Sequence, residues 1–363
     1  MNRIRVSLKD RAYDILIGRG LMHEAGVIIK KLKAGNDAIV VTNKNIAVIY
    51  GKTLKNSLVK SGISIKFEFV PDSEQAKSSA ILIRLLNRIG SYDKNKALFI
   101  IALGGGVIGD LAGFAASVYK RGVPYVQVPT TLLAQIDSAI GGKVAIDLKV
   151  AKNLVGAFYQ PKAVISDVAT LTSLPARQVK NGLAECIKYG VIKDDGLFKY
   201  IEDNYKKLIS IDLETIERAI LASAKIKAGI VNEDELDNKG KRAILNYGHT
   251  IGHAIEAASG YSGGYNHGEA IAIGMIIAAG ISSRIGLMEE SDCNRIESLI
   301  KKCGLPTRIK GLKLSAIYDA HLRDKKFIHG KNRFILPLGI GKARVVEGIP
   351  DSVVLKTIKE HME

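Results

Sequence analysis

Five short runs of apolar and β-branched residues stand out in the first half of the chain, at residues 38–42, 64–70, 97–103, 125–129 and 163–167. Runs of this length predict β-strands, and the helical spacing of apolar side chains between them, as in residues 77–89, predicts helices. Strands that alternate with helices are typical of a parallel sheet that is covered by helices on both faces. We therefore expect residues 1–168 to form an α/β, Rossmann-like nucleotide-binding domain.

The pattern changes after residue 168, where long helical periodicity replaces the β-branched runs. Helices are predicted at residues 215–231, 250–259 and 269–285, and one more strand is predicted at 333–338. At 363 residues, the chain is longer than the ~250–300 residues at which single hydrophobic cores stop growing. We therefore expect a second, mostly α-helical domain over residues 169–363.

Composition and charge narrow the choice of partners. The formal net charge is +17, but the lysines are scattered and no basic run is interleaved with aromatic residues, so an anionic small molecule is favoured over nucleic acid. No apolar run reaches the ~20 residues of a membrane span, and the first ten residues contain no apolar signal region. The cysteines Cys186, Cys293 and Cys303 have no metal-binding spacing, which indicates free thiols in a reducing cytoplasm.

Three residues in the second half could hold a metal ion. Glu185, His249 and His267 offer one carboxylate and two imidazoles, a common ligand set for a catalytic zinc that keeps one position open. His253 follows His249 by one helical turn and lies on the same face of the predicted helix. Because the three residues lie far apart in the chain, chance placement among seven histidines is the alternative.

A glycine-rich turn at residues 104–109 fits the spacing G-x-G-x-x-G, between a predicted strand and a predicted helix. In this context, glycines let backbone N–H groups approach a pyrophosphate at a helix N-terminus. Two features differ from the usual dinucleotide fingerprint. The turn lies in the middle of the domain, and residues 128–131 (Val-Pro-Thr-Thr) stand where an acidic residue would end the next strand. A tight turn that packs a helix on a strand is the alternative.

Several cations could hold an anionic substrate. Gly141-Gly142-Lys143 is not a P-loop, but a glycine pair beside a lysine can still surround an anion. Arg121, Lys227 and Arg242 could bind a carboxylate and a phosphate. Each of them taken singly could equally be a solvated surface charge.

Taken together, these motifs resemble the 3-dehydroquinate synthase family, in the right order and over the full length of the chain. The segments that carry the resemblance are residues 104–110, 127–133, 137–143, 152–158, 182–190, 245–253, 267–269 and 323–326. The resemblance implies an enzyme of the shikimate pathway that converts 3-deoxy-D-arabino-heptulosonate 7-phosphate (DAHP) to 3-dehydroquinate and phosphate. It also implies a divalent metal, Zn²⁺ or Co²⁺, and an NAD that is regenerated in each turnover. In the reaction that the resemblance implies, a substrate hydroxyl is oxidised, phosphate is eliminated and the hydride returns; the sugar ring then opens, and an internal aldol step closes the new ring.

The resemblance assigns roles to matching residues. The implied metal ligands are Glu185, His249 and His267. The implied catalytic and substrate-binding residues are Lys188, His253, Asp137, Lys143, Arg242, Lys227, Asn246, Lys152, Asn153, Arg121 and one of Lys325 or Lys326. The implied cofactor contacts are Asn43, Asn45, Glu74, Lys77, Gly105, Gly106, Asp110, Thr130 and Thr131, together with Lys143 and Lys152. His253 is the candidate proton shuttle, with the substrate phosphate as the alternative base. Arg121 is expected to reach the phosphate of a neighbouring subunit, which implies a homodimer.

Two positions depart from the family pattern. Asn238 stands where a carboxylate is usual, with Asp237 beside it, so that Asp237 is an alternative for this role. Asn43 replaces a common aspartate at the adenosine ribose; we expect NAD to bind, with more tolerance of NADP.

Two other enzymes remain as rivals. A related sugar-phosphate cyclase would act on a substrate without a carboxylate, and Lys227 with Arg242 argues against it. A simple polyol dehydrogenase would not need the cations around Lys143 and Lys152.

Overall fold

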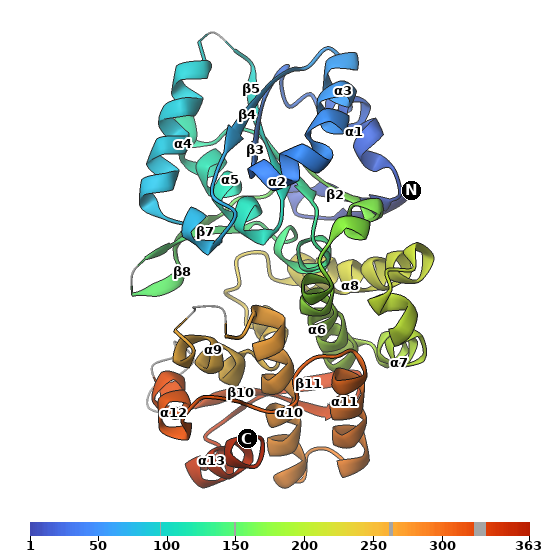
Figure 1. Cartoon of the computed structure of the whole chain (residues 1–363), viewed down its shortest axis with the longest axis vertical. Coiled ribbons are helices and arrows are strands. Elements are labelled where there is room, and N and C mark those ends of the chain that lie inside the picture. Colours follow the sequence, from blue (N-terminus) through green and yellow to red (C-terminus); the bar gives the residue numbers. More distant parts are fainter. Residues whose placement is uncertain (95, 149, 261–263, 323–331) are drawn as a thin grey trace. The chain divides into compact units, whose positions relative to one another are not determined.

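The computed structural model describes residues 1–94, 96–148, 150–260, 264–322 and 332–363, and the chain folds into two compact units (Figure 1). The first unit is Met1–Leu174 with Lys227–Leu236, and the second is Pro175–Ile226 with Asp237–Glu363. The sequence predicts a single boundary at residue 168. The structure instead assigns residues 227–236, which lie beyond that boundary, to the first unit. In the described part of the chain, no helix has the length and apolar character needed to cross a membrane.

The first unit is built on a seven-stranded sheet with the strand order β1-β2-β9-β6-β5-β3-β4. The strands are β1 (Asn2–Val6), β2 (Tyr13–Gly18), β3 (Asp37–Thr42), β4 (Ser64–Phe69), β5 (Leu98–Gly104), β6 (Tyr125–Pro129) and β9 (Ala163–Asp167). The strands predicted near residues 38–42, 64–70, 97–103, 125–129 and 163–167 are therefore confirmed. The sheet is mixed, because β1 pairs with β2 in antiparallel fashion while the other strand pairs are parallel.

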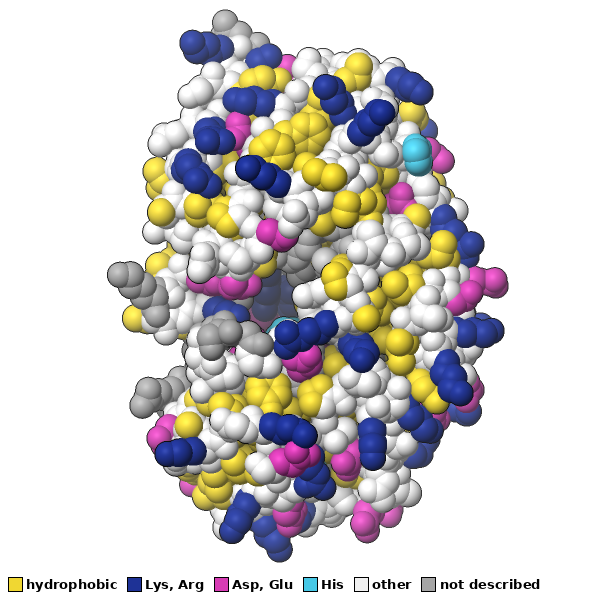
Figure 2. Space-filling model, viewed as in Figure 1, with side chains coloured by type: hydrophobic (Ala, Val, Ile, Leu, Met, Phe, Trp, Pro, Cys, Tyr) yellow, Lys and Arg dark blue, Asp and Glu magenta, His cyan; other side chains and the backbone are white. Residues whose placement is uncertain are grey.

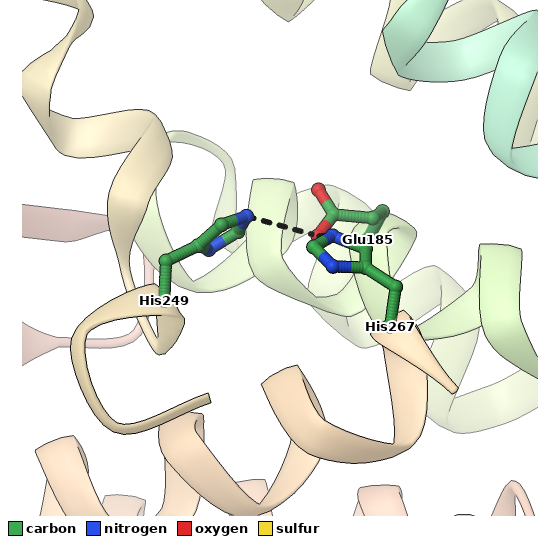
Figure 3. Close-up of side chains that lie close together, drawn as sticks. All are labelled: Glu185, His249 and His267. Carbon is green, nitrogen blue, oxygen red and sulfur yellow. Dashed lines mark ion pairs between the residues drawn. The ribbon is translucent and has the colours of Figure 1, made fainter. Parts of the chain in front are cut away.

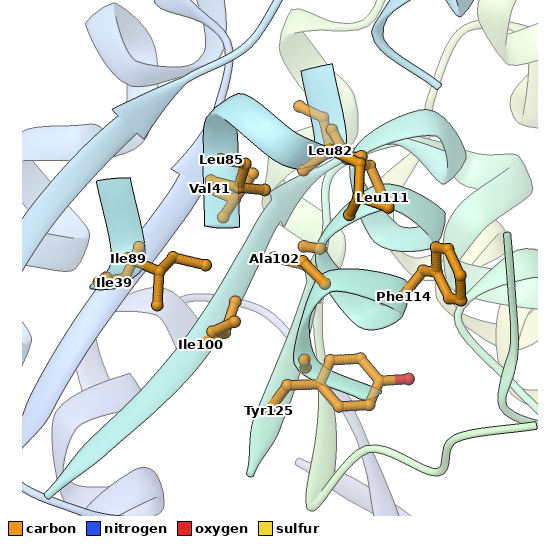
Figure 4. Packing of buried hydrophobic residues seen from close by; sticks show 14 of the residues in the cluster. Ile39, Val41, Leu82, Leu85, Ile89, Ile100, Ala102, Leu111, Phe114 and Tyr125 are labelled. Atoms are coloured by element: carbon orange, nitrogen blue, oxygen red, sulfur yellow. The ribbon is translucent and has the colours of Figure 1, made fainter. Parts of the chain in front are cut away.

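Side chains of the central strands alternate between two hydrophobic cores. Ile39 and Val41 of β3 belong to the core that includes residues of α4 (Ser79–Tyr92) and α5 (Gly106–Val118), part of which Figure 4 shows. Ala38 and Val40 belong to the other core, with residues of α1 (Leu21–Lys31) and α3 (Lys52–Lys60). Because both faces are covered, central strands such as β5 and β6 are continuous apolar runs, as buried parallel strands usually are.

The glycine-rich turn lies at the point where the strand order reverses. The chain runs outward from β3 to β4 and then returns to β5 on the other side of β3. The parallel register pairs Val41 with Ala102, so Asn43 and Gly104 leave the sheet at the same edge. In open α/β sheets, ligands bind at this edge, at the topological switch point. The position of the turn in the middle of the domain therefore does not argue against nucleotide binding.

A two-stranded hairpin, β7 (Lys143–Leu148) and β8 (Ala151–Phe158), completes the first unit. It packs on α5, where a Cβ added to Gly113 would lie 2.4 Å from a methyl carbon of Val144. The strand patterns did not predict this hairpin, because most of β8 is exposed and lacks a buried face.

The second unit is mostly helical. Its elements are α6 (Ala176–Lys193), α7 (Asp195–Ile209), most of α8 (Leu213–Glu233), α9 (His249–Ala258), α10 (His267–Arg284), α11 (Glu290–Lys302), α12 (Leu314–Leu322), the antiparallel pair β10 (Arg333–Gly339) and β11 (Lys342–Glu347), and α13 (Asp351–Glu360). The helices predicted near residues 215–231, 250–259 and 269–285 are confirmed, as is the strand near 333–338. Helix α10 is central, since α6, α9, α11, α13 and β10 all pack on it (Figure 1).

Glycines let α9 and α10 approach each other closely. A Cβ added to Gly274 would lie 2.0 Å from the carbonyl oxygen of Gly248. Gly248 itself caps the N-terminus of α9 with a φ of 77°, a left-handed conformation that favours glycine. This contact fixes the start of α9, and therefore His249, against α10.

We expect Gly274→Ala to destabilise the protein by about 1–3 kcal/mol or more, because the added methyl group must force the two helices apart. Urea unfolding measures the change in the free energy of unfolding. The control is Gly229→Ala in α8, where an added Cβ meets nothing within 4 Å. That substitution should be neutral or stabilising by up to ~1 kcal/mol. Equal effects of the two substitutions would contradict the close contact.

Candidate metal centre

Helix α6 supplies a buried acid and a buried base. Glu185 is 0% exposed and Lys188 is 1% exposed, and their separation of three residues puts them on one face of the helix. The ammonium group of Lys188 forms an ion pair with the Glu185 carboxylate and lies 4.9 Å from the centre of the Tyr189 ring. A buried carboxylate without a cationic partner would cost several kcal/mol, so this pairing is part of what makes the site possible.

The other two candidate ligands stand at the starts of α9 and α10. His267 is the first residue of α10, directly after the N-cap Asn266, which forms a capping box with Glu269. Arg177, in the first turn of α6, binds both carboxylate oxygens of Glu269 at 2.8 and 2.7 Å. The beginnings of α6 and α10 are therefore held together, and this sets the position of the His267 backbone.

The three candidate ligands converge on one point (Figure 3). Nε2 of His249 and Nε2 of His267 each lie 3.7 Å from Oε1 of Glu185. Ligand atoms of a tetrahedral zinc, with bonds of about 2.0–2.2 Å, lie about 3.4 Å apart. The side chains that the sequence singled out are thus close enough to share one ion after small adjustments.

The second ring nitrogen of each histidine has an oxygen partner. Nδ1 of His249 lies 3.0 Å from the carbonyl oxygen of Tyr247, and Nδ1 of His267 lies 3.2 Å from Oε2 of Glu256. A carbonyl oxygen can only accept, so Nδ1 of His249 carries a proton and its Nε2 can offer a lone pair when the ring is neutral.

The charges at this centre favour a cation. Burial alone lowers the pKa of His267, but hydrogen bonds to Glu185 and Glu256 raise it to about 10. His267 is thus protonated at neutral pH in the metal-free protein, between two carboxylates. Metal ligation requires the neutral imidazole, so binding a divalent ion would replace that proton. Carboxylate and imidazole donors around a partly exposed centre fit Zn²⁺ or Co²⁺.

Of the other predicted residues of the second unit, His253 lies beside this centre. The centre of the His253 ring lies 5.2 Å from that of His249 and 6.2 Å from that of His267. Arg242 is buried, and Asn246 ends the same short 3₁₀ segment, Lys241–Asn246. Lys325 and Lys326 lie outside the described residues. Asp237 and Asn238 are the two alternatives at the position where the family pattern has a carboxylate. They are neighbours in one loop, and Asp237 has a φ of 54°.

Glu256 is a residue of this centre that the sequence reasoning missed. It is 8% exposed and contacts His267, and His253, Glu256 and His267 bring ligand atoms within 4.8 Å of one another. The available signal was its spacing: His249, His253 and Glu256 follow one another at i, i+4 and i+7, which places them on one face of α9.

In the first unit, three predicted residues gather around the ammonium group of a fourth, Lys77. Lys77 donates a hydrogen bond of 2.7 Å to Asp110, contacts Asn153, and lies 3.7 Å from Glu74. Burial raises the pKa of Asp110 to about 6 in spite of the opposing charge of Lys77. Burial lowers the pKa of Lys77, but Asp110, Glu74 and Asp147 together more than compensate, so that the net shift is upward. The turn before α4, the N-terminus of α5 and the hairpin thus meet in one polar cluster around the buried Lys77 ammonium.

The predicted anion-binding residues of the first unit are more dispersed. Buried Lys227 donates a hydrogen bond of 2.7 Å to Asp137, so the first unit includes this pair. Lys143 lies over the Phe158 ring at 5.9 Å, and Lys152 stands on the neighbouring strand of the hairpin. Arg121 is exposed, in a turn where its φ is 64°. On the face drawn in Figure 2, basic side chains are spread among acidic ones rather than gathered in one stripe.

A pocket of about 410 Å³ opens beside the carboxyl ends of β3 and β4. Asn43, Asn45 and Asp72 line it, and both asparagines donate hydrogen bonds to the Asp72 carboxylate, at 2.6 and 2.8 Å.

Thr130 follows β6 at the same edge of the sheet, and its buried Oγ1 has no hydrogen-bond partner among the described residues. Its neighbour Thr131 contacts the glycine-rich turn, since a Cβ on Gly105 would lie 3.1 Å from its methyl group. Gly106, next in the turn, begins α5 without a side-chain cap. Buried polar atoms and helix N–H groups at a switch point fit a dinucleotide.

Solved structures of similar fold include two synthases with NAD⁺ and a divalent metal bound. A 2-deoxy-scyllo-inosose synthase complexed with carbaglucose-6-phosphate, NAD⁺ and Co²⁺ is 29% identical, with a TM-score of 0.90 over 99% of this chain and 100% of that chain. A 2-epi-5-epi-valiolone synthase from Streptomyces hygroscopicus subsp. jinggangensis 5008, with NAD⁺ and Zn²⁺ bound, is 24% identical, with a TM-score of 0.88 over 97% of both chains. This second likeness concerns the fold, and it supports the predicted dehydroquinate synthase-like architecture.

Sequence comparison identifies the family more specifically than the likeness of fold does. Residues 68–181 match the family described as 3-dehydroquinate synthase N-terminal, and residues 182–327 match 3-dehydroquinate synthase C-terminal. A 3-dehydroquinate synthase of Desulforamulus reducens is 42% identical over 361 residues, which cover 99% of this chain and 100% of that protein. These matches confirm the resemblance that the motifs indicated: the chain belongs to the 3-dehydroquinate synthase family.

Proposed function

We propose that the protein is a 3-dehydroquinate synthase, a carbon–oxygen lyase that converts DAHP to 3-dehydroquinate and phosphate in the shikimate pathway. The observation that carries this proposal is the convergence of Glu185, His249 and His267 in a chain that is 42% identical to a 3-dehydroquinate synthase over its whole length. The relatives that bind NAD⁺ with Co²⁺ or Zn²⁺ support the same pair of cofactors here.

The two cofactors would supply chemistry that side chains lack. When bound, a divalent cation acidifies a nearby substrate hydroxyl and NAD⁺ accepts and returns a hydride. The protein's own groups position the substrate and move protons. Lys188 stands beside Glu185 and can donate a hydrogen bond to a hydroxyl at the metal. His253 is exposed next to the two histidine ligands and can hold a proton in the elimination step.

Cationic groups are proposed to bind the two anionic ends of DAHP. Lys143, Lys152 and Arg121 would bind the phosphate or its surroundings, and Lys227 and Arg242 the carboxylate. Asp137 already pairs with Lys227, so a substrate hydroxyl could bind to the same carboxylate. These assignments explain why the enzyme would prefer DAHP to a sugar phosphate without a carboxylate.

The nucleotide is proposed to bind at the switch point of the sheet, with its pyrophosphate at Gly105 and Gly106 and its ribose near Asn43. The cluster of Lys77, Asp110 and Asn153 would stand beside the nicotinamide end. We also propose a homodimer, supported by the exposed position of Arg121, and a cytoplasmic setting, supported by the three free cysteines.

Metal removal tests the central part of this proposal. We expect a chelator to abolish phosphate release from DAHP in the presence of NAD, and Zn²⁺ or Co²⁺ to restore it. His249→Ala should lower kcat/KM by roughly 10³-fold, which corresponds to about 4 kcal/mol. The control His23→Ala removes an exposed histidine of α1 and should leave kcat/KM unchanged. Full activity after chelation, or in His249→Ala, would contradict the ligand assignment.

Cofactor preference tests the ribose pocket. We expect NAD to be preferred, because Asp72 keeps a negative charge where Asn43 has none. Asp72→Asn should shift the ratio of NAD to NADP affinity by roughly tenfold towards NADP, equivalent to about 1.4 kcal/mol of lost charge repulsion. Fluorescence titration with NADH and NADPH measures both affinities, and Asp10→Asn, at an exposed site in the same unit, is the control. A clear preference of the wild-type protein for NADP would refute this assignment.

A further inference from the structure

Glu256 is a buried carboxylate to which the proposed function gives no role. It lies one helical turn after His253 and two turns after His249 on the same face of α9. Its Oε2 is 3.2 Å from Nδ1 of His267, whose opposite ring nitrogen faces Glu185. The imidazole of His267 is thus held between two carboxylates from two different helices.

The chemistry of imidazole gives this contact a consequence. A neutral histidine has one N–H donor and one lone pair, and the hydrogen bond at one nitrogen decides which nitrogen can bind a metal. An ionised carboxylate only accepts hydrogen bonds, so Glu256 favours the proton on Nδ1 of His267. Nε2 then presents its lone pair towards Glu185 Oε1, which is 3.7 Å away.

The two candidate histidine ligands have different acceptors for the hydrogen bond at Nδ1. The acceptor for His249 is the carbonyl oxygen of Tyr247, two residues earlier in the same segment. The acceptor for His267 is a side chain from another helix. Glu256 therefore links α9 to His267, the first residue of α10. Because the acceptor is a side chain, a substitution of Glu256 removes this hydrogen bond and leaves the backbone unchanged.

A different arrangement would make Glu256 a ligand itself, together with His253 and His267. Two features argue against it. The 3.2 Å separation of Glu256 Oε2 and His267 Nδ1 is that of a direct hydrogen bond. In addition, one member of the second cluster, His253, is exposed, whereas Glu185 of the first cluster is fully buried, so the first cluster is better shielded from water.

We propose that Glu256 is a positioning residue that fixes the tautomer and orientation of His267 and thereby increases the affinity of the Glu185–His249–His267 centre for its metal. This inference rests on the proposed metal site. Carboxylates that accept a hydrogen bond from a ligating histidine typically change metal affinity by 10- to 100-fold when they are removed.

The test measures Zn²⁺ affinity directly, by competition with a chromogenic chelator in metal-stripped protein. We expect Glu256→Gln, which keeps a neutral acceptor, to weaken binding by roughly 10-fold, and Glu256→Ala by roughly 100-fold. Glu202→Gln is the matched control. Glu202 belongs to the same unit, but its carboxylate accepts a hydrogen bond from Arg295 and not from a histidine. This variant should bind Zn²⁺ with the affinity of the wild-type protein. NADH affinity should be the same in all variants.

The possible failures are distinct. If the wild-type protein binds Zn²⁺ and both Glu256 variants bind it equally well, the role of Glu256 is refuted and the proposed function stands. If the wild-type protein binds no divalent metal, the proposed function fails together with this inference. If His253→Ala loses as much Zn²⁺ affinity as His249→Ala, the second cluster is the metal site and Glu256 is a ligand.

A measurement on the wild-type protein covers the case in which the Glu256 variants do not fold. Long-range ¹H–¹⁵N NMR spectra of the zinc-loaded protein report which nitrogen of each histidine ring carries the proton. We expect a protonated Nδ1 and a metal-bound Nε2 for His267. A metal-bound Nδ1 would overturn the proposal.

Discussion

The candidate metal centre of the second unit is built around the carboxylate of Glu185. It is completely buried, with Lys188 on its own helix and the Nε2 atoms of His249 and His267 at 3.7 Å. A buried negative charge is stable only when cations or donors surround it. In the metal-free protein the surroundings supply the ammonium group and a protonated His267, whose pKa is about 10. The same surroundings suit a divalent ion, which would bind as the histidine loses its proton.

Close packing of helices brings these groups together. Gly274 lets α10 approach the carbonyl of Gly248, and Gly268 fits against the backbone of Asn181, where an added Cβ would lie 2.4 Å from the carbonyl oxygen. The capping box at Asn266 and the ion pair between Arg177 and Glu269 fix the same helix start. A site that needs its ligands within a few tenths of an ångström is therefore built on rigid helix starts.

The site of the first unit depends on a different feature, the reversal of strand order within the parallel part of its sheet. The carboxyl ends of β3, β5 and β6 bring Asn43, the glycine-rich turn and Thr130 to one edge, although they lie far apart in the chain. The ion pair between buried Lys77 and half-buried Asp110 adds a charged group to this unit. Asp72 adds a negative charge beside Asn43. Asn43 donates its hydrogen bond to this carboxylate, so the pocket beside β3 and β4 keeps an acidic side chain.

The sequence by itself determined the features that depend on local order. Apolar runs gave β3, β5, β6 and β9, helical periodicity gave α9 and α10, and the motifs around Glu185, His249 and His267 gave the family. Only the tertiary structure decided which distant groups meet: the antiparallel β1, the hairpin with Lys143 and Lys152, the return of residues 227–236, Asp72 beside Asn43, and Glu256 beside His267. The reason is physical. Periodicity reports which side of an element is buried, but the partner of a polar side chain depends on how elements pack, and that packing is set by contacts between residues far apart in the chain.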